Sequence, residues 1–167
     1  MHYEIHTDEH ASSPREDENM GTIMLVPNKY IIADYQATLE EVEDKLKDKN
    51  CIALPVYAYI HSGISINTTG FQCPWDSGRV GCIFVSREQI REDFKIKRIS
   101  SKLEVKIRNY LNQEIEIFNN YINGNVYGFI VKDDLNQEID SCWGFYSRED
   151  AERAAEDSMN YFINKVA

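Results

Sequence analysis

Two hydrophobic runs in the middle of the chain, residues 52–60 and 80–85, constrain the fold more than any other feature. Both are rich in β-branched and aromatic residues, and both have the length of a strand rather than of a buried helix. Pro55 cannot donate a ladder hydrogen bond, so it predicts a bulge or a strand side without a partner. We therefore expect two central strands, separated by a polar stretch.

Four segments carry the signals of helices. Thr38 suits the N-cap of a helix over residues 38–48, which has acidic residues in its first turns and lysines in its last. Ser86 is the expected N-cap of a short helix that ends near residue 94. Apolar residues at spacings of three and four predict a longer helix from about residue 100, ended by a left-handed Gly124. Ser147 is expected to cap a terminal helix.

Further strands are expected at residues 2–6, 21–26, 126–131 and 139–146, and the last two are joined by the turn 132–137. This order favours an α+β fold, with an antiparallel or mixed β-sheet and about four helices, mostly packed on one face. A chain of 167 residues has the usual size of one domain. We therefore expect a single domain over 1–167, in which residues 1–20 form a strand and a loosely ordered loop.

The formal net charge is −10, from 28 Asp and Glu against 18 Lys and Arg. This excess argues against direct nucleic-acid binding, because Lys and Arg are the residues that neutralise phosphates. It fits either solubility alone or binding to a basic protein surface. The stretch from Arg79 to Arg98 is locally basic, as a decorated helix face would be. No apolar run approaches the ~18 residues of a membrane span and no signal pattern is seen, so a cytoplasmic protein without a membrane partner is expected.

Acidic residues gather in four clusters that could take the place of phosphates on a basic partner. Exposed aromatic side chains such as Trp75 and Tyr146 would anchor that partner. In the segment 142–146, strand alternation would place Trp143 and Phe145 on the same face. The predicted binding residues are Glu16, Asp17, Glu18, Glu40, Glu41, Glu43, Asp44, Trp75, Asp76, Asp133, Asp134, Tyr146, Glu149 and Asp150.

The loop between the two central runs has an unusual composition for a surface connection. Phe71, Pro74 and Trp75 stand beside Asp76, which suggests a loop folded against another part of the molecule. A purely structural role is the simpler interpretation. In that role Asp76 would accept backbone hydrogen bonds in a turn, and Trp75 would cover the edge of the core.

The same loop also holds the residue types of a hydrolase. Nucleophilic catalysis needs a serine or cysteine, a base and an acid that orients the base. No Gly-x-Ser-x-Gly motif surrounds any of the candidate serines, so this prediction lacks the usual motif. If the protein is an enzyme, the expected catalytic residues are His61, Cys73, Asp76 and Ser77.

No metal or cofactor is predicted. The four cysteines form no C-x-x-C pair, which argues against a structural zinc site and leaves free thiols in a reducing compartment. Three of them lie in apolar runs and are expected to be buried, and Cys73 is the one expected to be accessible. The histidines at 2, 6 and 10 occur in an extended segment and are expected to be exposed. The buried set is Cys51, Cys82 and Cys142.

Several segments resemble, in the same order along the chain, a family of small uncharacterised acidic proteins carried by bacteriophages and mobile elements of Gram-positive bacteria. The resemblance implies a genetic setting in which small accessory proteins act on host machinery, including restriction and CRISPR nucleases. It implies no catalytic residues. The segments are Ser13–Gly21, His61–Ser65, Pro74–Gly78, Val126–Phe129 and Asp140–Tyr146, and they include the sequences PWDSG and SCWGFY.

Three hypotheses follow. In the first, the protein binds and inhibits a basic host protein that handles nucleic acid, as an anti-restriction or anti-CRISPR protein would. In the second, it is a small hydrolase or nucleotide-degrading enzyme centred on His61 and Asp76. In the third, it is a structural or self-assembling accessory protein, and a homodimer is compatible with each of the three.

Overall fold

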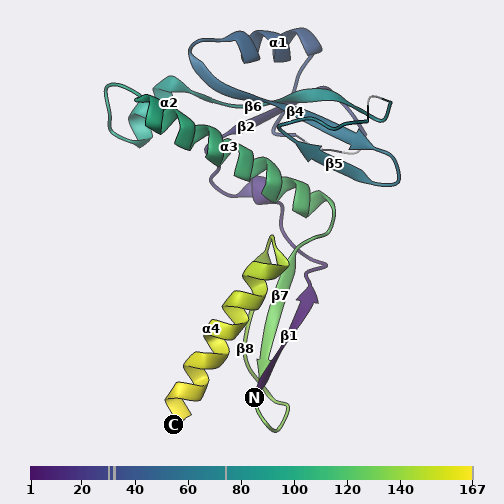
Figure 1. Cartoon of the computed structure of the whole chain (residues 1–167), viewed down its shortest axis with the longest axis vertical. Helices are drawn as coiled ribbons and strands as arrows, with labels where there is room; N and C mark the ends of the chain where they lie inside the picture. Colours follow the sequence, from purple (N-terminus) through teal and green to yellow (C-terminus); the bar gives the residue numbers. More distant parts are fainter. Residues whose placement is uncertain (30, 32, 74, 167) are drawn as a thin grey trace. The chain divides into compact units, whose positions relative to one another are not determined.

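The computed structural model describes residues 1–29, 31, 33–73 and 75–166 and confirms the α+β class. Its helices and strands fall into two compact units, shown in Figure 1, and each unit has a sheet of its own. The smaller unit combines residues 1–16 with the chain from residue 120 onward, and the larger unit is residues 17–119. The expected single domain over 1–167 stays a prediction, and the two units are described separately below.

The larger unit is built on a five-stranded mixed sheet. The two hydrophobic runs form its longest strands, which pair antiparallel near the centre of the sheet, as predicted. β2 and β3 are parallel, and every other pair is antiparallel. The strands, in order across the sheet, are β3 (Tyr35–Gln36), β2 (Thr22–Leu25), β6 (Ser77–Ser86), β4 (Cys51–Ile60) and β5 (Ile64–Asn67).

Pro55 lies in β4 at a point where only one side of the strand is paired. It stands opposite Cys82 of β6, whereas β5 pairs only with the part of β4 from Tyr57 to Ile60. The register with β6 then shifts between Val56 and Tyr57. Both expectations for this proline, an unpaired strand side and a local irregularity, are confirmed.

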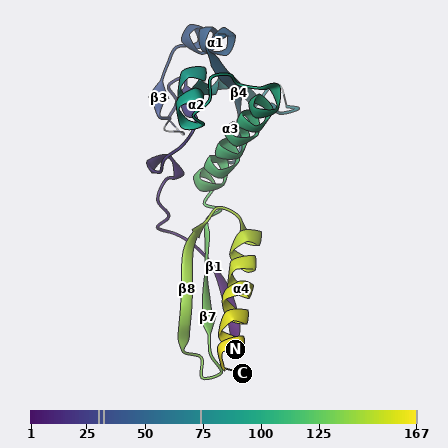
Figure 2. The ribbon, with the colours of Figure 1, turned by 90° about the vertical axis from the view of Figure 1, so that its left-hand side faces the viewer.

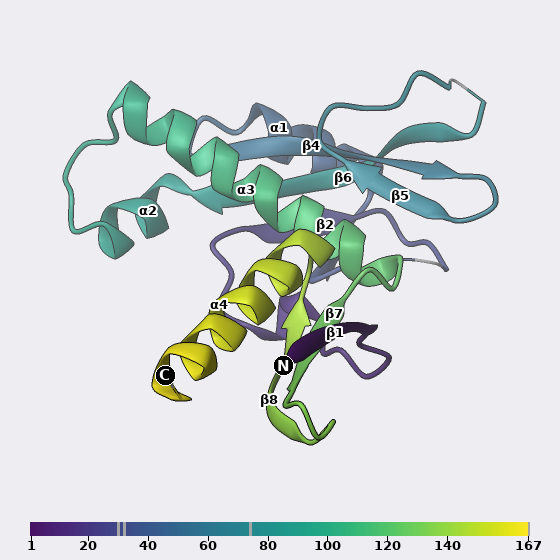
Figure 3. The ribbon, with the colours of Figure 1, turned by 60° about the horizontal axis from the view of Figure 1, so that its bottom comes forward.

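Helices cover both faces of this sheet. α1 (Leu39–Lys47) lies on one face, and α3 (Ser101–Ile122) runs across the opposite face, as Figure 1 shows. The short α2 (Arg87–Asp93) and the strand β5 lie at opposite ends of the larger unit (Figure 3). The fully buried side chains on these elements, each of which stabilises the fold by roughly 1.5–3 kcal/mol, include Ile23, Leu25, Ile52, Ile83, Ile107, Leu111 and Ile115.

The predicted helix ends are confirmed. Thr38 caps α1 through a capping box: its hydroxyl accepts from the backbone N–H of Glu41, and the Glu41 carboxylate accepts from the N–H of Thr38. Ser86 caps α2 through its hydroxyl, which accepts from the backbone N–H of Gln89. Gly124 has φ +69°, the left-handed conformation that ends α3.

The smaller unit is a three-stranded antiparallel sheet covered by one helix. β1 (His2–Thr7) and β8 (Glu138–Phe145) flank β7 (Tyr127–Lys132), and α4 (Arg148–Val166) packs along one face (Figure 2). The core between them contains Phe129, Val131 and Ala155. A short 3₁₀ turn, Pro14–Glu16, follows β1. No helix among the described residues is long and apolar enough to cross a membrane.

The end of β8 does not alternate as predicted. A bulge places both Trp143 and Gly144 between the pairs Phe129–Cys142 and Tyr127–Phe145, and Gly144 has φ +86°. Phe145 therefore packs into the core, whereas Trp143 lies on Gly128 and is 46% exposed. Cys142 is also exposed, because β8 is an edge strand, so the prediction of its burial is wrong.

Gly81 supplies the first testable prediction, since the sheet leaves no room for a side chain there. A Cβ atom at Gly81 would lie 2.0 Å from the carbonyl oxygen of Met24, whereas a Cβ at Gly78 in the same strand would contact nothing within 4 Å. We expect Gly81→Ala to lower the free energy of unfolding by about 3 kcal/mol, because the clash is with backbone. Gly78→Ala is the matched control. Urea denaturation followed by circular dichroism measures both, and equal stability of the two variants would contradict the packing described here.

Candidate binding groove beside helix α1

A groove of about 630 Å³ opens between α1 and the sheet of the larger unit. One wall is α1 with its C-cap residue Asp48, and the α1 residues at positions 41, 44 and 45 lie on one side of the helix because they are three or four residues apart. The other wall comes from β2, β3 and β6. The lining residues are Thr22, Met24, Asp34, Tyr35, Glu41, Asp44, Lys45, Asp48 and Phe84.

The floor of the groove is apolar and aromatic. Met24 is buried in the small cluster that packs α1 on the sheet, and Phe84 packs against the same cluster. Tyr35 lies at the sheet edge and is 50% exposed. An exposed aromatic ring beside a buried apolar floor is a surface that can contact the hydrocarbon part of a ligand.

The rim of the groove carries four carboxylates in different states of engagement. Asp34 accepts a hydrogen bond of 2.8 Å from the N–H of Ile23, and Glu41 is the capping residue of α1. Asp48 accepts from the N–H of Asn50 at 2.8 Å. These backbone donors hold the pKa of Glu41 and of Asp48 below the ordinary range of a carboxyl group.

Asp44 differs from the other three carboxylates of the rim. It is exposed, and no described residue makes a hydrogen bond or ion pair with it. It is therefore the rim carboxylate whose acceptor capacity is available to a ligand.

Lys45 shows how the groove holds a cation. Its Nζ lies 4.7 Å from the centroid of the Phe84 ring and 3.8 Å from a carboxylate oxygen of Asp48. The ammonium group thus combines an aromatic face with a carboxylate, which is the usual setting of a cation–π contact.

The rest of the predicted cluster on α1 points elsewhere. Glu43 pairs with Arg79 of β6 and, at 3.6 Å, with Lys47, and Glu40 is exposed in the first turn. The structure therefore brings Glu41 and Asp44 into the groove with Asp34 and Asp48, which the sequence interpretation missed. The helical spacing from Glu41 to Asp48 could have indicated the second of these, whereas Asp34 lies in a loop without any periodic signal.

The other predicted acidic clusters do not lie in this groove. Glu16 ends the 3₁₀ turn of the smaller unit, and Asp17 and Glu18 begin the larger one. Within the smaller unit, the acidic side chains are largely engaged. Asp133 accepts from the N–H groups of Leu135 and Gln137, Asp134 pairs with the N-terminal amine, and Asp150 pairs with Arg153 beside Glu149.

The two predicted aromatic anchors differ in exposure. The Tyr146 hydroxyl donates to the carbonyl oxygen of Ser12 at 3.2 Å, so this side chain is half-buried in the smaller unit. Trp75 is 91% exposed, so it does not cover the edge of the core. Of the neighbouring loop residues, Phe71 packs on Tyr59 with ring centroids 5.7 Å apart, and Pro74 lies outside the described residues.

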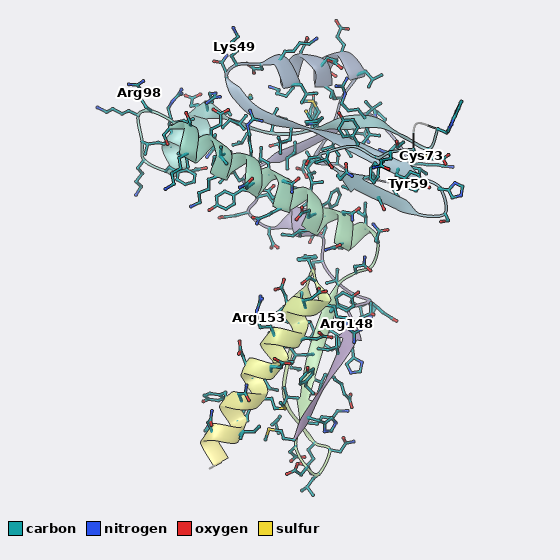
Figure 4. The ribbon with its side chains drawn as sticks, in the orientation of Figure 1. Lys49, Tyr59, Cys73, Arg98, Arg148 and Arg153 are labelled. Atoms are coloured by element: carbon teal, nitrogen blue, oxygen red, sulfur yellow. The ribbon has the colours of Figure 1, made fainter. Side chains whose placement is uncertain are left out.

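The predicted catalytic residues lie together at the end of the sheet that carries β5. Asp76 is central among them: its carboxylate lies 3.4 Å from Nδ1 of His61 and 3.8 Å from Sγ of Cys73. The Ser77 hydroxyl donates to the carbonyl oxygen of Cys73. Figure 4 labels Cys73 and Tyr59, whose ring stacks on His61 at 6.3 Å.

This arrangement pairs an imidazole with a carboxylate but does not place a nucleophile on the imidazole. In a cysteine or serine hydrolase the base contacts the nucleophile directly, whereas here the carboxylate lies next to the thiol and Ser77 is bonded to backbone. Among the described residues, no group of three or more His, Cys, Asp or Glu side chains could hold a metal ion. The loop therefore has the geometry of a hydrogen-bonded turn that carries an exposed tryptophan, Trp75.

Comparison with known proteins adds no relative: no protein-family model, curated protein or solved structure matches the chain. The geometry of the groove and of the loop therefore carries the functional argument.

The cysteines supply the second prediction, an order of reaction with a thiol reagent. Cys142 is exposed and Cys73 is half-buried, whereas Cys82 is fully buried and burial raises its pKa to about 11. Burial and the Asp48 carboxylate also raise the pKa of Cys51. We expect iodoacetamide at pH 8 to label Cys142 first and Cys73 next, because alkylation needs an accessible thiolate.

Peptide mapping by mass spectrometry measures this order. Labelling in urea is the control, since it should make all four cysteines react at comparable rates. Early labelling of Cys82 in the folded protein would contradict the described packing of β6.

Proposed function

We propose that this protein is a binding protein, and that the groove beside α1 receives a lysine or arginine side chain of a basic partner. The observation that carries the proposal is the combination of an unpaired carboxylate, Asp44, with an aromatic and apolar floor in one groove. The aliphatic stem of a basic side chain suits that floor, and its charged head suits the rim.

The resident Lys45 supports this proposal from within the chain. It already combines the Phe84 ring with the Asp48 carboxylate, so the groove offers the contacts that a cation needs. Tyr35 offers a further exposed ring and Asp44 a further carboxylate in the same groove. A guanidinium group would suit this surface especially well, because it stacks on rings and donates two parallel hydrogen bonds to a carboxylate.

The class of partner follows from charge and from the family resemblance. A protein with a net charge of −10 is steered toward cationic surfaces, and surfaces that handle nucleic acid are cationic. Carboxylates at the rim would occupy places otherwise taken by phosphates. We therefore propose that binding inhibits a nucleic-acid-handling protein of a bacterial host, such as a restriction or CRISPR nuclease. The hydrolase and the self-assembling protein stay predictions from the sequence.

The third prediction concerns Asp44→Lys, which reverses the one available charge of the rim. Asp34, Glu41 and Asp48 are less suitable targets, since each also holds backbone N–H groups. We expect Asp44→Lys to weaken binding of a fluorescein-labelled arginine-rich peptide about tenfold, because an exposed attraction of up to ~1 kcal/mol is replaced by a repulsion of similar size. Fluorescence anisotropy at 50 mM and 300 mM salt measures this affinity.

Asp157→Lys is the matched control, because Asp157 is also an exposed helical carboxylate without a hydrogen bond or ion pair to any described residue, but lies in the smaller unit. Affinity capture from bacterial lysate with the same three proteins then tests the partner. Basic proteins should be retained by the native chain and by Asp157→Lys, released by salt, and lost with Asp44→Lys. Equal weakening by both variants would show that net charge alone acts, and the groove proposal would fail.

A further inference from the structure

The connection between α2 and α3 is the part of this acidic protein that is most strongly basic. Residues 94–103 hold four cations and no carboxylate, although the chain as a whole has a net charge of −10. We call the four residues, Lys95, Lys97, Arg98 and Lys102, the basic lobe. The sequence-based expectation that the protein avoids nucleic acid rested on total charge, and total charge does not describe this local surface.

The backbone displays these cations outward. α2 ends at Asp93, and Lys95 has a left-handed φ of +53°. α3 then begins at Ser101, and the Ser100 hydroxyl accepts from the N–H of Leu103 at 3.2 Å. Figure 4 shows the labelled Arg98 side chain projecting from this connection, at the opposite end of the larger unit from Cys73.

The cations of the basic lobe have no acidic partner among the described residues, in contrast to Arg79, Arg87 and Arg108. Arg87 and Arg108 share Glu104, at 2.9 and 3.2 Å, and Arg79 pairs with Glu43. The four lobe residues are exposed, and no described residue forms an ion pair with any of them. These four cations therefore lack an acidic partner among the described residues, although the chain has a large excess of carboxylates.

A second groove of about 490 Å³ adjoins the basic lobe along the first turns of α3. Val105 on its surface is 59% exposed, and Lys106 stands over the Tyr110 ring with its Nζ 5.3 Å from the centroid. The first N–H groups of α3 add the positive end of the helix dipole to this surface. The lining residues are Ser100, Lys102, Leu103, Val105, Lys106 and Asn109.

We propose that the basic lobe and this groove bind the sugar–phosphate backbone of a nucleic-acid strand. Four exposed cations within eight residues gain little from the carboxylates of another protein, because exposed ion pairs contribute at most ~1 kcal/mol each. A nucleic-acid strand differs, since every neutralised phosphate releases a condensed counterion. Flexible Lys and Arg side chains without positioned base-reading groups fit backbone contact rather than sequence reading.

The acidic remainder of the chain limits this affinity without abolishing it. The carboxylates nearest along the chain are Glu88, Glu92 and Asp93 of α2 and Glu104 of α3, and Glu104 is already paired with two arginines. More distant carboxylates are screened beyond about 10 Å at 0.1 M salt. Binding is therefore expected at low salt, with a strong dependence on salt concentration.

The fourth prediction is binding of a labelled 20-nucleotide single strand, measured by fluorescence anisotropy with the full chain. For four phosphate contacts, a rise from 50 to 200 mM salt should weaken binding about 50-fold. The variant Lys97→Glu with Arg98→Glu should lose more than tenfold in affinity at 50 mM salt, because two contacts become two repulsions. No binding at 50 mM salt, or binding that does not change with salt, would overturn the proposal.

The control variant combines Lys49→Glu with Lys165→Glu, which lowers the net charge by the same four units at exposed positions outside residues 94–103. It should keep the native affinity, and equal losses in the two variants would overturn the proposal. Asp44→Lys should also leave oligonucleotide binding within a fewfold of native, so failure here is distinguishable from failure of the groove beside α1. Tighter binding to anionic lipid vesicles, or self-association removed by the lobe variant, would assign this surface to another partner and overturn the proposal.

Discussion

The antiparallel ladder between β4 and β6 is the interaction on which the rest of the larger unit depends. It pairs the two most apolar segments of the chain over their full lengths, and it buries side chains on both of its faces. α3 covers one face and α1 covers part of the other. The groove exists because α1 has only nine residues and cannot cover the whole face on which it lies. The apolar floor of the groove is therefore the part of the core that α1 leaves uncovered, and two of its rim carboxylates, Glu41 and Asp44, belong to α1.

The larger unit has separate acidic and basic surfaces, which its total charge does not reveal. Carboxylates of α1 and of the loop before β3 surround the groove, whereas unpaired cations occupy the connection between α2 and α3. Salt screens interactions between exposed charges over distances of about 10 Å, so two such surfaces can act independently on one small unit. An acidic chain can in this way approach a basic protein with one surface and phosphates with another.

The sequence predicted the regular elements well because each had a local physical signal. Thr38, Ser86 and Gly124 mark helix ends by chemistry that acts within one turn, and the runs that became β4 and β6 carry β-branched residues throughout. Local signals failed where a neighbouring strand decides the outcome. β5 was missed because its four residues become a strand only by pairing with the end of β4, and the bulge at Gly144 reverses the facing of Phe145. Of the four rim carboxylates, Glu41 and Asp44 were among the predicted binding residues. Asp48 and Asp34 were not, and Asp34 lies in a loop without a periodic signal.

The smaller unit is assembled from two distant parts of the chain. β1 pairs with β7, and Thr7 stands opposite Tyr127, so the entire larger unit is inserted between the two strands of one ladder. During synthesis at about 5–20 residues per second, β1 waits roughly ten seconds on the ribosome before its partner emerges. The inserted unit, by contrast, is continuous and can complete its own sheet during that interval. The order of synthesis thus favours early folding of the larger unit and late pairing of β1 with β7.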